Sequence, residues 1–244
     1  MSGHSKWSQI KRQKGVADVK RGQAFTKLAN AIIVGVRQEK NPDPETNFKL
    51  RLLIEKAREA NMPKENIQRA IERGMGTADG GDVLEEALYE GFGPEKVAVM
   101  IEVVTDNKQR TAASIKNIFE KGEGGLGVPG TVAYFFRKIG IIGVNKDKND
   151  FDRIMLLAAE SGAEDIAEKE DSFEIYTDPD KISAIKEELL KKGLAVNSSE
   201  LTFIPKNPIL LSLEKTDRVN RFILELEDLS EVQRVYSDAR KLPI

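Results

Sequence analysis

Basic side chains gather at the N-terminus, around the only tryptophan of the chain. The first thirty residues contain seven Lys or Arg and a single acid, Asp18. Through Met75 the chain has 16 basic and 8 acidic residues, a net charge of +8, whereas the remainder has 22 basic and 32 acidic residues, a net charge of −10. Cations concentrated in this way attract phosphate backbones. The N-terminal segment is therefore predicted to carry the affinity for a nucleic acid.

Trp7 stands in this polar, basic segment and has two interpretations. An indole beside cations can stack on exposed bases, or it can anchor the segment onto the helices that follow. We favour stacking or RNA contact. The residues predicted to bind nucleic acid are His4, Lys6, Trp7, Lys11, Arg12, Lys14, Lys20, Arg21, Lys27, Lys64 and Arg69.

A glycine-rich segment is a second candidate, with five glycines between Gly122 and Gly130. Glycine lets a backbone approach a ligand or an RNA strand closely, although a flexible connection from a helix to a strand is the alternative. The match to G-x-G-x-x-G is not a dinucleotide site, because it follows a predicted helix, precedes a predicted strand and contains Pro129. The candidate residues are Gly124, Gly125, Leu126, Gly127 and Gly130.

The composition argues against catalysis. There is no cysteine and only one histidine, and no carboxylate cluster has the spacing of a metal site. We expect no catalytic residues, no metal, no cofactor and no small-molecule substrate, and we rank a metal-dependent nuclease well below a binding protein. The longest apolar runs have the length of strands, so no membrane span is predicted. The N-terminus partly resembles a mitochondrial transit signature but is rich in Lys, and we expect a cytoplasmic protein.

The elements that would position these residues begin with a helical domain over residues 1–75. A stripe of apolar residues at helical spacing predicts a helix over 23–37. Two further amphipathic helices follow, one around Ile54 and one that begins at Pro63 and is capped by Gly74. Short connections between such helices favour a small helical domain.

Beyond a glycine-rich linker, strands alternate with helices. A strand over 97–104 leads through the N-cap Asn107 into a helix that ends at Gly122, and 132–136 is predicted as a strand.

Residues 138–205 have the order βαββαβ, typical of the split-βαβ or ferredoxin-like arrangement. The predicted elements are strand 141–144, helix 150–161, strands 165–169 and 173–177, helix 179–192 and strand 199–204.

The short elements after Pro205 bury too little to form a domain alone. We therefore predict that they complete the earlier sheet, giving a discontinuous domain of residues 82–137 plus 206–244 with 138–205 inserted. The fold class is α+β with three domains, an N-terminal helical domain followed by two α/β sandwich domains (ferredoxin-like), the last inserted into the middle one.

Several motifs in order along the whole chain resemble the YebC family. They are Met1–Trp7, Ile10-Lys11, Phe25-Thr26-Lys27, Asn61-Met62-Pro63-Lys64, Asn66-Ile67, Arg69-Ala70-Ile71, Thr105-Asp106-Asn107, Arg110-Thr111, Gly124-Gly125-Leu126-Gly127 with Gly130, Gly162-Ala163-Glu164-Asp165, Ile204-Pro205-Lys206-Asn207, Val232-Gln233 and Val235-Tyr236-Ser237.

This resemblance implies three domains, a cytoplasmic location and nucleic-acid-linked regulation without a catalytic centre. The family label implies a transcriptional regulator that binds DNA, which is our first expectation. The mitochondrial relatives, which are translational activators, imply the alternative of a ribosome-associated translation factor contacting rRNA. Physically, the sequence predicts binding to a polyanion and does not separate DNA from RNA.

Overall fold

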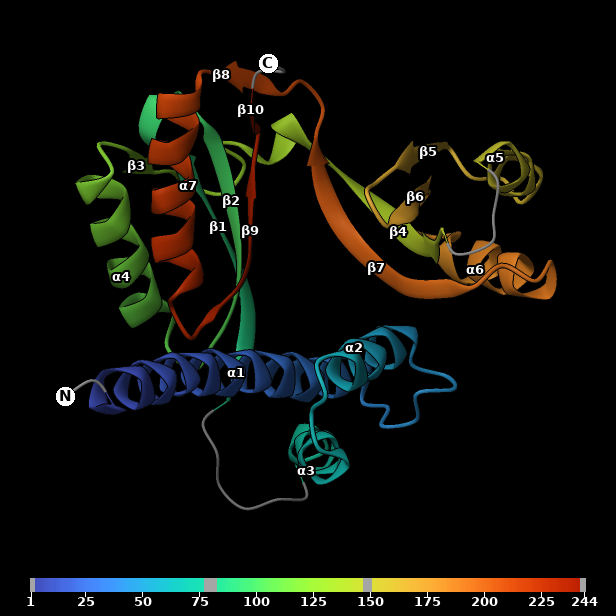
Figure 1. Ribbon diagram of the computed structural model, residues 1–244, viewed down its shortest axis with the longest axis horizontal. Helices are drawn as coiled ribbons and strands as arrows, with labels where there is room; N and C mark the ends of the chain where they lie inside the picture. The colour runs from blue at the N-terminus through green and yellow to red at the C-terminus, as the bar shows by residue number, and fades with distance from the viewer. Residues whose placement is uncertain (1–2, 77–82, 147–150, 242–244) are drawn as a thin grey trace.

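The first element is one long helix, α1 (Gly3–Glu39), of 37 residues. The computed structural model (Figure 1) describes residues 3–76, 83–146 and 151–241, with side chains from Lys20 to Arg240. The predicted helix over 23–37 is the C-terminal half of α1, where Ile32, Ile33 and Val36 are buried. The helix begins well before residue 23, because the basic segment is rich in Lys, Arg and Gln, which favour helices, and contains no proline.

Two shorter helices, α2 (Phe48–Glu59) and α3 (Lys64–Gly74), pack against this half of α1. Their apolar faces form a common core, which includes Leu50, Ile54, Ala57, Met62, Ile67 and Ala70. The buried Asn47 caps α2, because its side-chain oxygen accepts a hydrogen bond from the Leu50 N–H. Its amide nitrogen donates to the carbonyl oxygens of Gly35 and Asn41, which fixes the turn between α1 and α2.

Gly74 does not cap α3 as predicted but ends the helix in close contact with α1. A Cβ atom at this position would lie 2.7 Å from Val36 Cβ and 2.8 Å from the Ile33 carbonyl oxygen. The glycine is thus required by the approach of the two helices. The left-handed backbone conformation that favours glycine occurs two residues later, at Gly76 with φ +73°.

The middle sheet is antiparallel, and a strand from the end of the chain completes it. It consists, in order, of β3 (Gly125–Leu126), β1 (Glu85–Phe92), β2 (Ala98–Thr105) and β9 (Val232–Ser237). Helices α4 (Lys108–Lys121) and α7 (Leu213–Glu227) cover one face (Figure 1). Asn107 caps α4 as predicted, since its side chain accepts from the Arg110 N–H.

Strand β2 lies in the centre of this sheet and is buried on both sides. Val99 and Ile101 face the two helices. Met100 belongs to a second cluster on the opposite face, where Phe203 also packs against Tyr236. A strand buried on both faces explains why its sequence is continuously apolar.

The third part of the chain has the predicted order βαββαβ. Its antiparallel sheet consists, in order, of β5 (Asp165–Glu168), β6 (Ser172–Thr177), β4 (Phe136–Asn145) and β7 (Val196–Pro205). Helices α5 (Phe151–Glu160) and α6 (Ile182–Lys191) pack on one face, over Ile142 and Ile175.

The segment 132–136 is not the predicted strand. Residues Ala133–Phe135 form a 3-10 turn, η2, and β4 begins only at Phe136. The apolar residues of the segment favour a strand on propensity, but the backbone N–H groups at its start bond to a side chain instead of a neighbouring strand.

Strands β4 and β7 form a long antiparallel ribbon that leads out of the middle part of the molecule and back to it (Figure 1). After β7, the strand β8 (Ile209–Leu211) pairs in parallel with β10 (Ala239–Lys241). A one-turn 3-10 helix, η1 (Pro94–Lys96), joins β1 to β2. Placing the domain boundaries at 1–75, 82–137 plus 206–244, and 138–205 remains our proposal.

Candidate nucleic-acid interface

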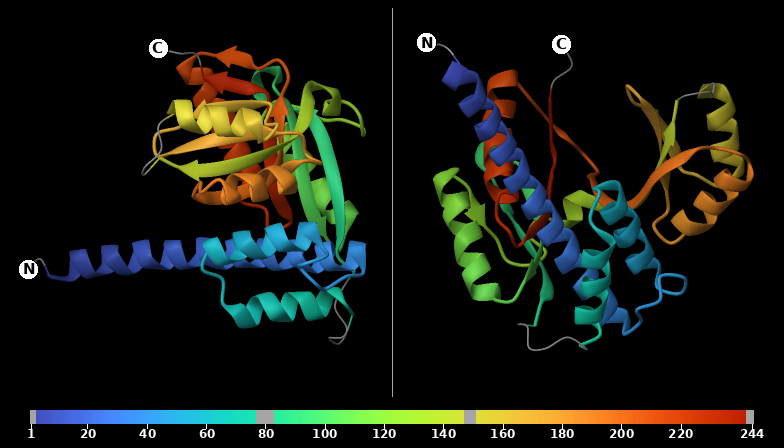
Figure 2. Two further views of the ribbon diagram at one scale, coloured as in Figure 1. Left: turned by 90° about the vertical axis from the view of Figure 1, so that its right-hand side faces the viewer. Right: turned by 60° about the horizontal axis from the view of Figure 1, so that its bottom comes forward.

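The N-terminal half of α1 carries most of the predicted basic residues. Figure 2 shows this half of the helix extending beyond the rest of the molecule. Lys20, the first residue with a described side chain, is exposed. The side chains of His4, Lys6, Trp7, Lys11, Arg12 and Lys14 lie outside the described part, so their contacts stay a prediction.

The remaining predicted residues do not form one surface. Lys27 is half-buried, and its Nζ donates a hydrogen bond to the Glu227 carbonyl oxygen at the end of α7. Burial lowers the pKa of Lys27 more than the nearby Glu227 and Asp228 raise it. Lysine at a helix C-terminus satisfies carbonyls that have no partner within the helix. Lys27 thus ties α1 to the middle part of the molecule.

Lys64 and Arg69 lie on α3, which packs on the other side of α1 from the middle sheet (Figure 1). Both are exposed. Arg69 donates to the Glu65 carbonyl oxygen and to Asn66 Oδ1 within its own helix. Arg21 is exposed on α1, and its side chain is not without an interaction partner.

The glycine-rich loop is held by a carboxylate that the sequence pattern did not single out. Glu90 of β1 is only 4% exposed, and its carboxylate accepts hydrogen bonds from the N–H groups of Gly130 (2.8 Å), Val132 (2.7 Å) and Ala133 (2.8 Å). Burial raises the pKa of Glu90, but these three bonds together outweigh it and lower the pKa. The loop is therefore a fixed structure.

The glycines of the loop have different roles. A Cβ at Gly124 would collide with the Phe92 carbonyl oxygen, and a Cβ at Gly127 would lie 2.6 Å from Thr131 Oγ1. Gly130 has φ +89°, which other residues rarely adopt. A Cβ at Gly125 would meet nothing within 4 Å. Packing explains Gly124 and Gly127, and backbone conformation explains Gly130, but neither explains Gly125, which is exposed.

Exposed apolar side chains surround this loop. Val128 at its tip is 73% exposed and Tyr134 is 61% exposed. The Tyr134 ring lies on that of Phe135, with centroids 4.2 Å apart and planes 30° from parallel. Phe92, at the end of β1, meets Phe135 edge to face at 6.2 Å. We call Phe92, Val128, Tyr134 and Phe135 the loop surface.

The loop surface and the basic helix lie at opposite ends of the middle sheet. Near the start of β1, Glu86 bonds to Gln38 of α1 and to Lys49 of α2. The loop surface is at the other end of the strand, beside Phe92. Eight residues of strand correspond to about 25 Å. The structure therefore does not bring the two predicted regions together.

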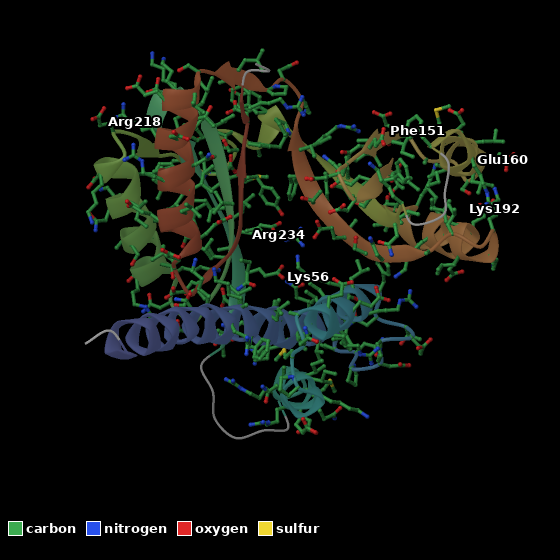
Figure 3. The ribbon with its side chains drawn as sticks, in the orientation of Figure 1. Lys56, Phe151, Glu160, Lys192, Arg218 and Arg234 are labelled. Atoms are coloured by element: carbon green, nitrogen blue, oxygen red, sulfur yellow. The ribbon has the colours of Figure 1, made fainter. Side chains whose placement is uncertain are left out.

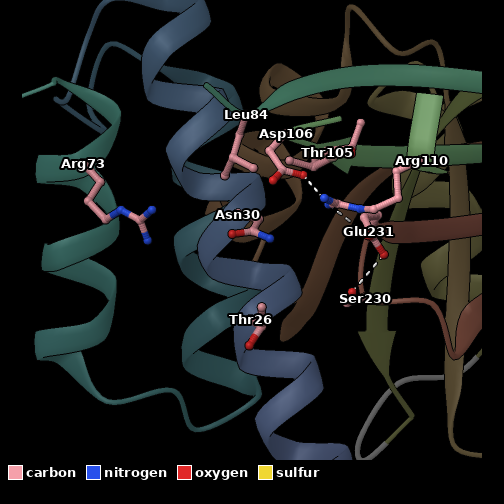
Figure 4. Close-up of a pocket in the computed structure, with 10 residues that line it drawn as sticks. Thr26, Asn30, Arg73, Leu84, Thr105, Asp106, Arg110, Ser230 and Glu231 are labelled. Atoms are coloured by element: carbon pink, nitrogen blue, oxygen red, sulfur yellow. Dashed lines mark hydrogen bonds and ion pairs between the residues drawn. The ribbon is translucent and has the colours of Figure 1, made fainter. Parts of the chain in front are cut away.

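A hollow of about 240 Å³ lies between α1, α3 and the middle sheet (Figure 4). Within it, Arg110 bonds to Asp106 at 2.5 Å and lies 3.6 Å from Glu231, so this one cation is shared by two carboxylates. Its lining residues are Thr26, Asn30, Arg73, Leu84, Val104, Thr105, Asp106, Arg110, Ser230 and Glu231. Among the described residues, no group of His, Asp and Glu could hold a metal ion.

Comparison with known proteins assigns the fold to a family. Residues 5–77 match the family described as "TACO1/YebC protein N-terminal domain", and residues 84–239 match "TACO1/YebC second and third domain". The chain belongs to the TACO1/YebC family, as the sequence motifs predicted.

Two curated relatives are each named "Probable transcriptional regulatory protein". One, from Caldanaerobacter subterraneus subsp. tengcongensis, is 46% identical over 97% of this chain and 97% of its own length. Another, from Roseiflexus castenholzii, is 45% identical over 98% of this chain and 94% of its own length.

The structure resembles the crystal structure of a conserved hypothetical protein from Aquifex aeolicus. The TM-score is 0.83 with 37% identity, over 93% of each chain. The predicted α+β fold class is confirmed. Within the described residues, no helix is long and apolar enough to cross a lipid bilayer.

Proposed function

We propose that this protein is a nucleic-acid-binding regulator that acts without catalysis in the cytoplasm, and that its first partner is DNA whose transcription it controls. The observation that carries the proposal is the concentration of positive charge in α1, a helix whose N-terminal half extends away from the rest of the molecule (Figure 2). A helix rich in Lys and Arg can lie along a phosphate backbone or in a major groove. The names of the curated relatives support a role in transcription.

The second candidate is a ribosome-associated translation factor that contacts rRNA. The exposed aromatic loop surface favours it, because unpaired bases that can stack on aromatic rings are common in folded RNA and rare in duplex DNA. The length of β1, about 25 Å, separates this surface from the end of α1 at Gln38, and two contact regions this far apart suit a large folded RNA.

Binding measurements over a range of salt concentrations test the proposal. Purified protein is titrated into duplex DNA and into a structured rRNA fragment between about 50 and 200 mM salt. For each phosphate contact, the slope of log K against log salt becomes steeper by about one unit. A variant with Lys11, Arg12 and Lys14 replaced by Ala should lose up to about three units of slope.

The matched control replaces Lys181, Lys191 and Arg221, three exposed cations outside α1, by Ala. This variant should keep the slope. The proposal fails if neither nucleic acid binds, or if the α1 variant binds like the control. Tighter binding to duplex DNA supports the transcriptional role, and tighter binding to the rRNA fragment supports the second candidate.

A further inference from the structure

We propose that the loop surface is a binding site for an unpaired base of a nucleic-acid strand, with Tyr134 as its stacking platform. This inference rests on the proposed function, because it assumes that the partner is a nucleic acid. It adds a site far from the basic helix and names the structure that the site recognises.

The first argument is the geometry of the aromatic rings. One face of Tyr134 lies on Phe135, whereas the residue as a whole is 61% exposed. Phe92 supports Phe135 from the side. The second ring supports the Tyr134 ring from one side, and the rest of the Tyr134 side chain is in water. A base can therefore stack on the Tyr134 ring as a third layer.

The second argument is that the surface is held rigidly. The buried Glu90 carboxylate accepts three N–H groups from the segment that leads into Tyr134, and the Gly127 N–H donates to the Glu90 carbonyl oxygen at 2.7 Å. A rigid platform loses little conformational entropy on binding. A buried carboxylate that does nothing but order a surface loop indicates that the shape of this loop matters.

The third argument is the local charge. Two of the carboxylates nearest in sequence are paired with cations, Glu95 with Lys215 and Arg218, and Glu123 with Arg218. The Glu90 carboxylate keeps its charge, but it is buried and bonded to the loop N–H groups.

Two lysines close to the rings in sequence, and a third joined to them by a backbone hydrogen bond, are free, unlike these carboxylates, to pair with phosphate groups. Lys96, Lys138 and Lys206 are exposed, and within the described part of the chain none of them is in an ion pair. Lys206 lies beside the platform, since its backbone N–H donates to the Phe135 carbonyl oxygen at 2.8 Å. Aromatic rings with unpaired cations close by in the sequence or through a backbone hydrogen bond suit a polyanion whose bases can stack, and they suit an apolar protein segment less well.

Gly125 gives a fourth argument. It pairs with Phe92 across β3 and β1, is exposed, and has open space where a Cβ would point. The fold does not require glycine there. A bare backbone next to an aromatic surface lets the sugar-phosphate chain of the bound strand come close.

The test uses the full-length protein and a single-stranded RNA of twelve nucleotides that contains 2-aminopurine, whose fluorescence falls when the base stacks. Wild-type protein should quench this fluorescence on binding. Tyr134→Ala should abolish most of the quenching and weaken binding by about 5- to 150-fold, whereas Tyr134→Phe should keep both. A duplex made from the same strand should bind wild type and Tyr134→Ala equally.

Leu224→Ala is the matched control, because Leu224 is 58% exposed on α7. It should behave like wild type. Because Tyr134 is mostly exposed, its variants should melt at the wild-type temperature.

Equal binding and quenching by wild type and Tyr134→Ala would overturn this inference while leaving the proposed function standing. The inference would also be overturned if Tyr134→Ala left RNA binding intact but lost a protein that co-purifies with wild type. Failure of wild type to bind any nucleic acid would overturn both proposals.

Discussion

Glu90 orders the loop surface through hydrogen bonds to the backbone of the loop. Three backbone N–H groups converge on its carboxylate. A buried N–H without a partner costs about as much as a lost hydrogen bond. The conformation of residues 130–133 should therefore depend on this one side chain.

Replacing Glu90 by Gln should lower the free energy of unfolding by about 1–3 kcal/mol at pH 7, because an amide keeps one acceptor and turns an N–H₂ group toward N–H donors. Urea denaturation followed by circular dichroism measures this loss. Glu225→Gln, an exposed change on α7, should stay within about 0.5 kcal/mol of wild type.

The difference in stability between wild type and Glu90→Gln should depend on pH. The pKa of Glu90 is lowered from its ordinary value of 4.5, so its carboxylate stabilises the folded state fully above that value. The stabilisation is lost as the pH falls through the lower folded-state pKa. The stability difference between wild type and Glu90→Gln should shrink below pH 4.5, and a difference that grew in acid would contradict this role.

Trp7 can be tested without knowing which way its side chain points. If it stacks on a base, Trp7→Ala should weaken nucleic-acid binding by ~1–3 kcal/mol and leave the melting temperature unchanged. If it anchors the helix, the same change should reduce stability by ~3–5 kcal/mol. Trp7→Phe keeps an aromatic face and should restore most of the binding in the first case. A destabilised Trp7→Ala protein that still binds would refute stacking.

At the scale of elements, the crossing of α1 and α3 depends on the absence of a side chain at Gly74. Gly74→Ala should lower the free energy of unfolding by about 1–3 kcal/mol, because the new Cβ meets Val36 and the Ile33 carbonyl oxygen.

Gly22→Ala is the matched control, since it lies in α1 with nothing within 4 Å of a new Cβ. It should stabilise the protein by up to about 1 kcal/mol, because alanine favours the helix. Both values come from urea denaturation. Equal stabilisation by the two changes would mean that the helices do not approach as closely at Gly74 as described.

The sequence predicted helices and strands well where periodicity or a continuous apolar run marks them, and it failed where tertiary contacts decide. The order βαββαβ and the N-cap Asn107 follow from periodicity and local hydrogen bonding, which act over a few residues. Gly74 resembles a helix cap in sequence, yet its role is set by a helix about forty residues away. The segment 132–136 has strand propensity, but Glu90 captures its N–H groups.

The candidate sites could be proposed from the sequence only in part, for the same reason. Charge and glycine content are visible in the sequence, so the basic segment and the loop could be proposed. The sequence analysis did not single out Tyr134, because it predicted 132–136 as a strand. The exposure of Tyr134 arises from the 3-10 turn that replaces this strand. Lys27 looked like any other cation of the basic segment until the structure placed it against the end of α7.

At the scale of the whole molecule, a polar junction joins the three parts (Figure 3). The Glu200 carboxylate of β7 accepts from Arg234 of β9 at 2.7 Å and from Lys56 of α2 at 3.2 Å. Arg234 also donates to the Leu201 carbonyl oxygen. Burial raises the pKa of Glu200, but the two cations outweigh it and lower the pKa. A second tie, between Glu55 of α2 and Lys186 of α6, measures 2.8 Å.

Glu200→Gln should loosen the arrangement of the parts without unfolding any of them, because each has its own apolar cluster. Small-angle scattering should show a larger radius of gyration, and hydrogen exchange should rise in α2 and β7. High salt should have a similar but weaker effect on wild type, because these ion pairs are partly exposed.

The control is Glu160→Gln, whose ion pair with Lys192 joins α5 to the residue after α6 within a single part (Figure 3). It should leave the scattering curve unchanged. If Glu200→Gln also leaves it unchanged, the ribbon of β4 and β7 alone sets the arrangement.

That ribbon also has a consequence for how such a chain can change over evolutionary time. Phe136 and Pro205 are direct partners where it leaves the middle part, so the points of departure and return are only about 5 Å apart. A turn of a few residues could bridge them, and β9 would still reach its place beside β2. The whole third part can therefore be gained, lost or exchanged as a single genetic cassette without changing the strand order of the sheet that it interrupts. Its loss would remove the contacts that Phe203 and Glu200 make with β9.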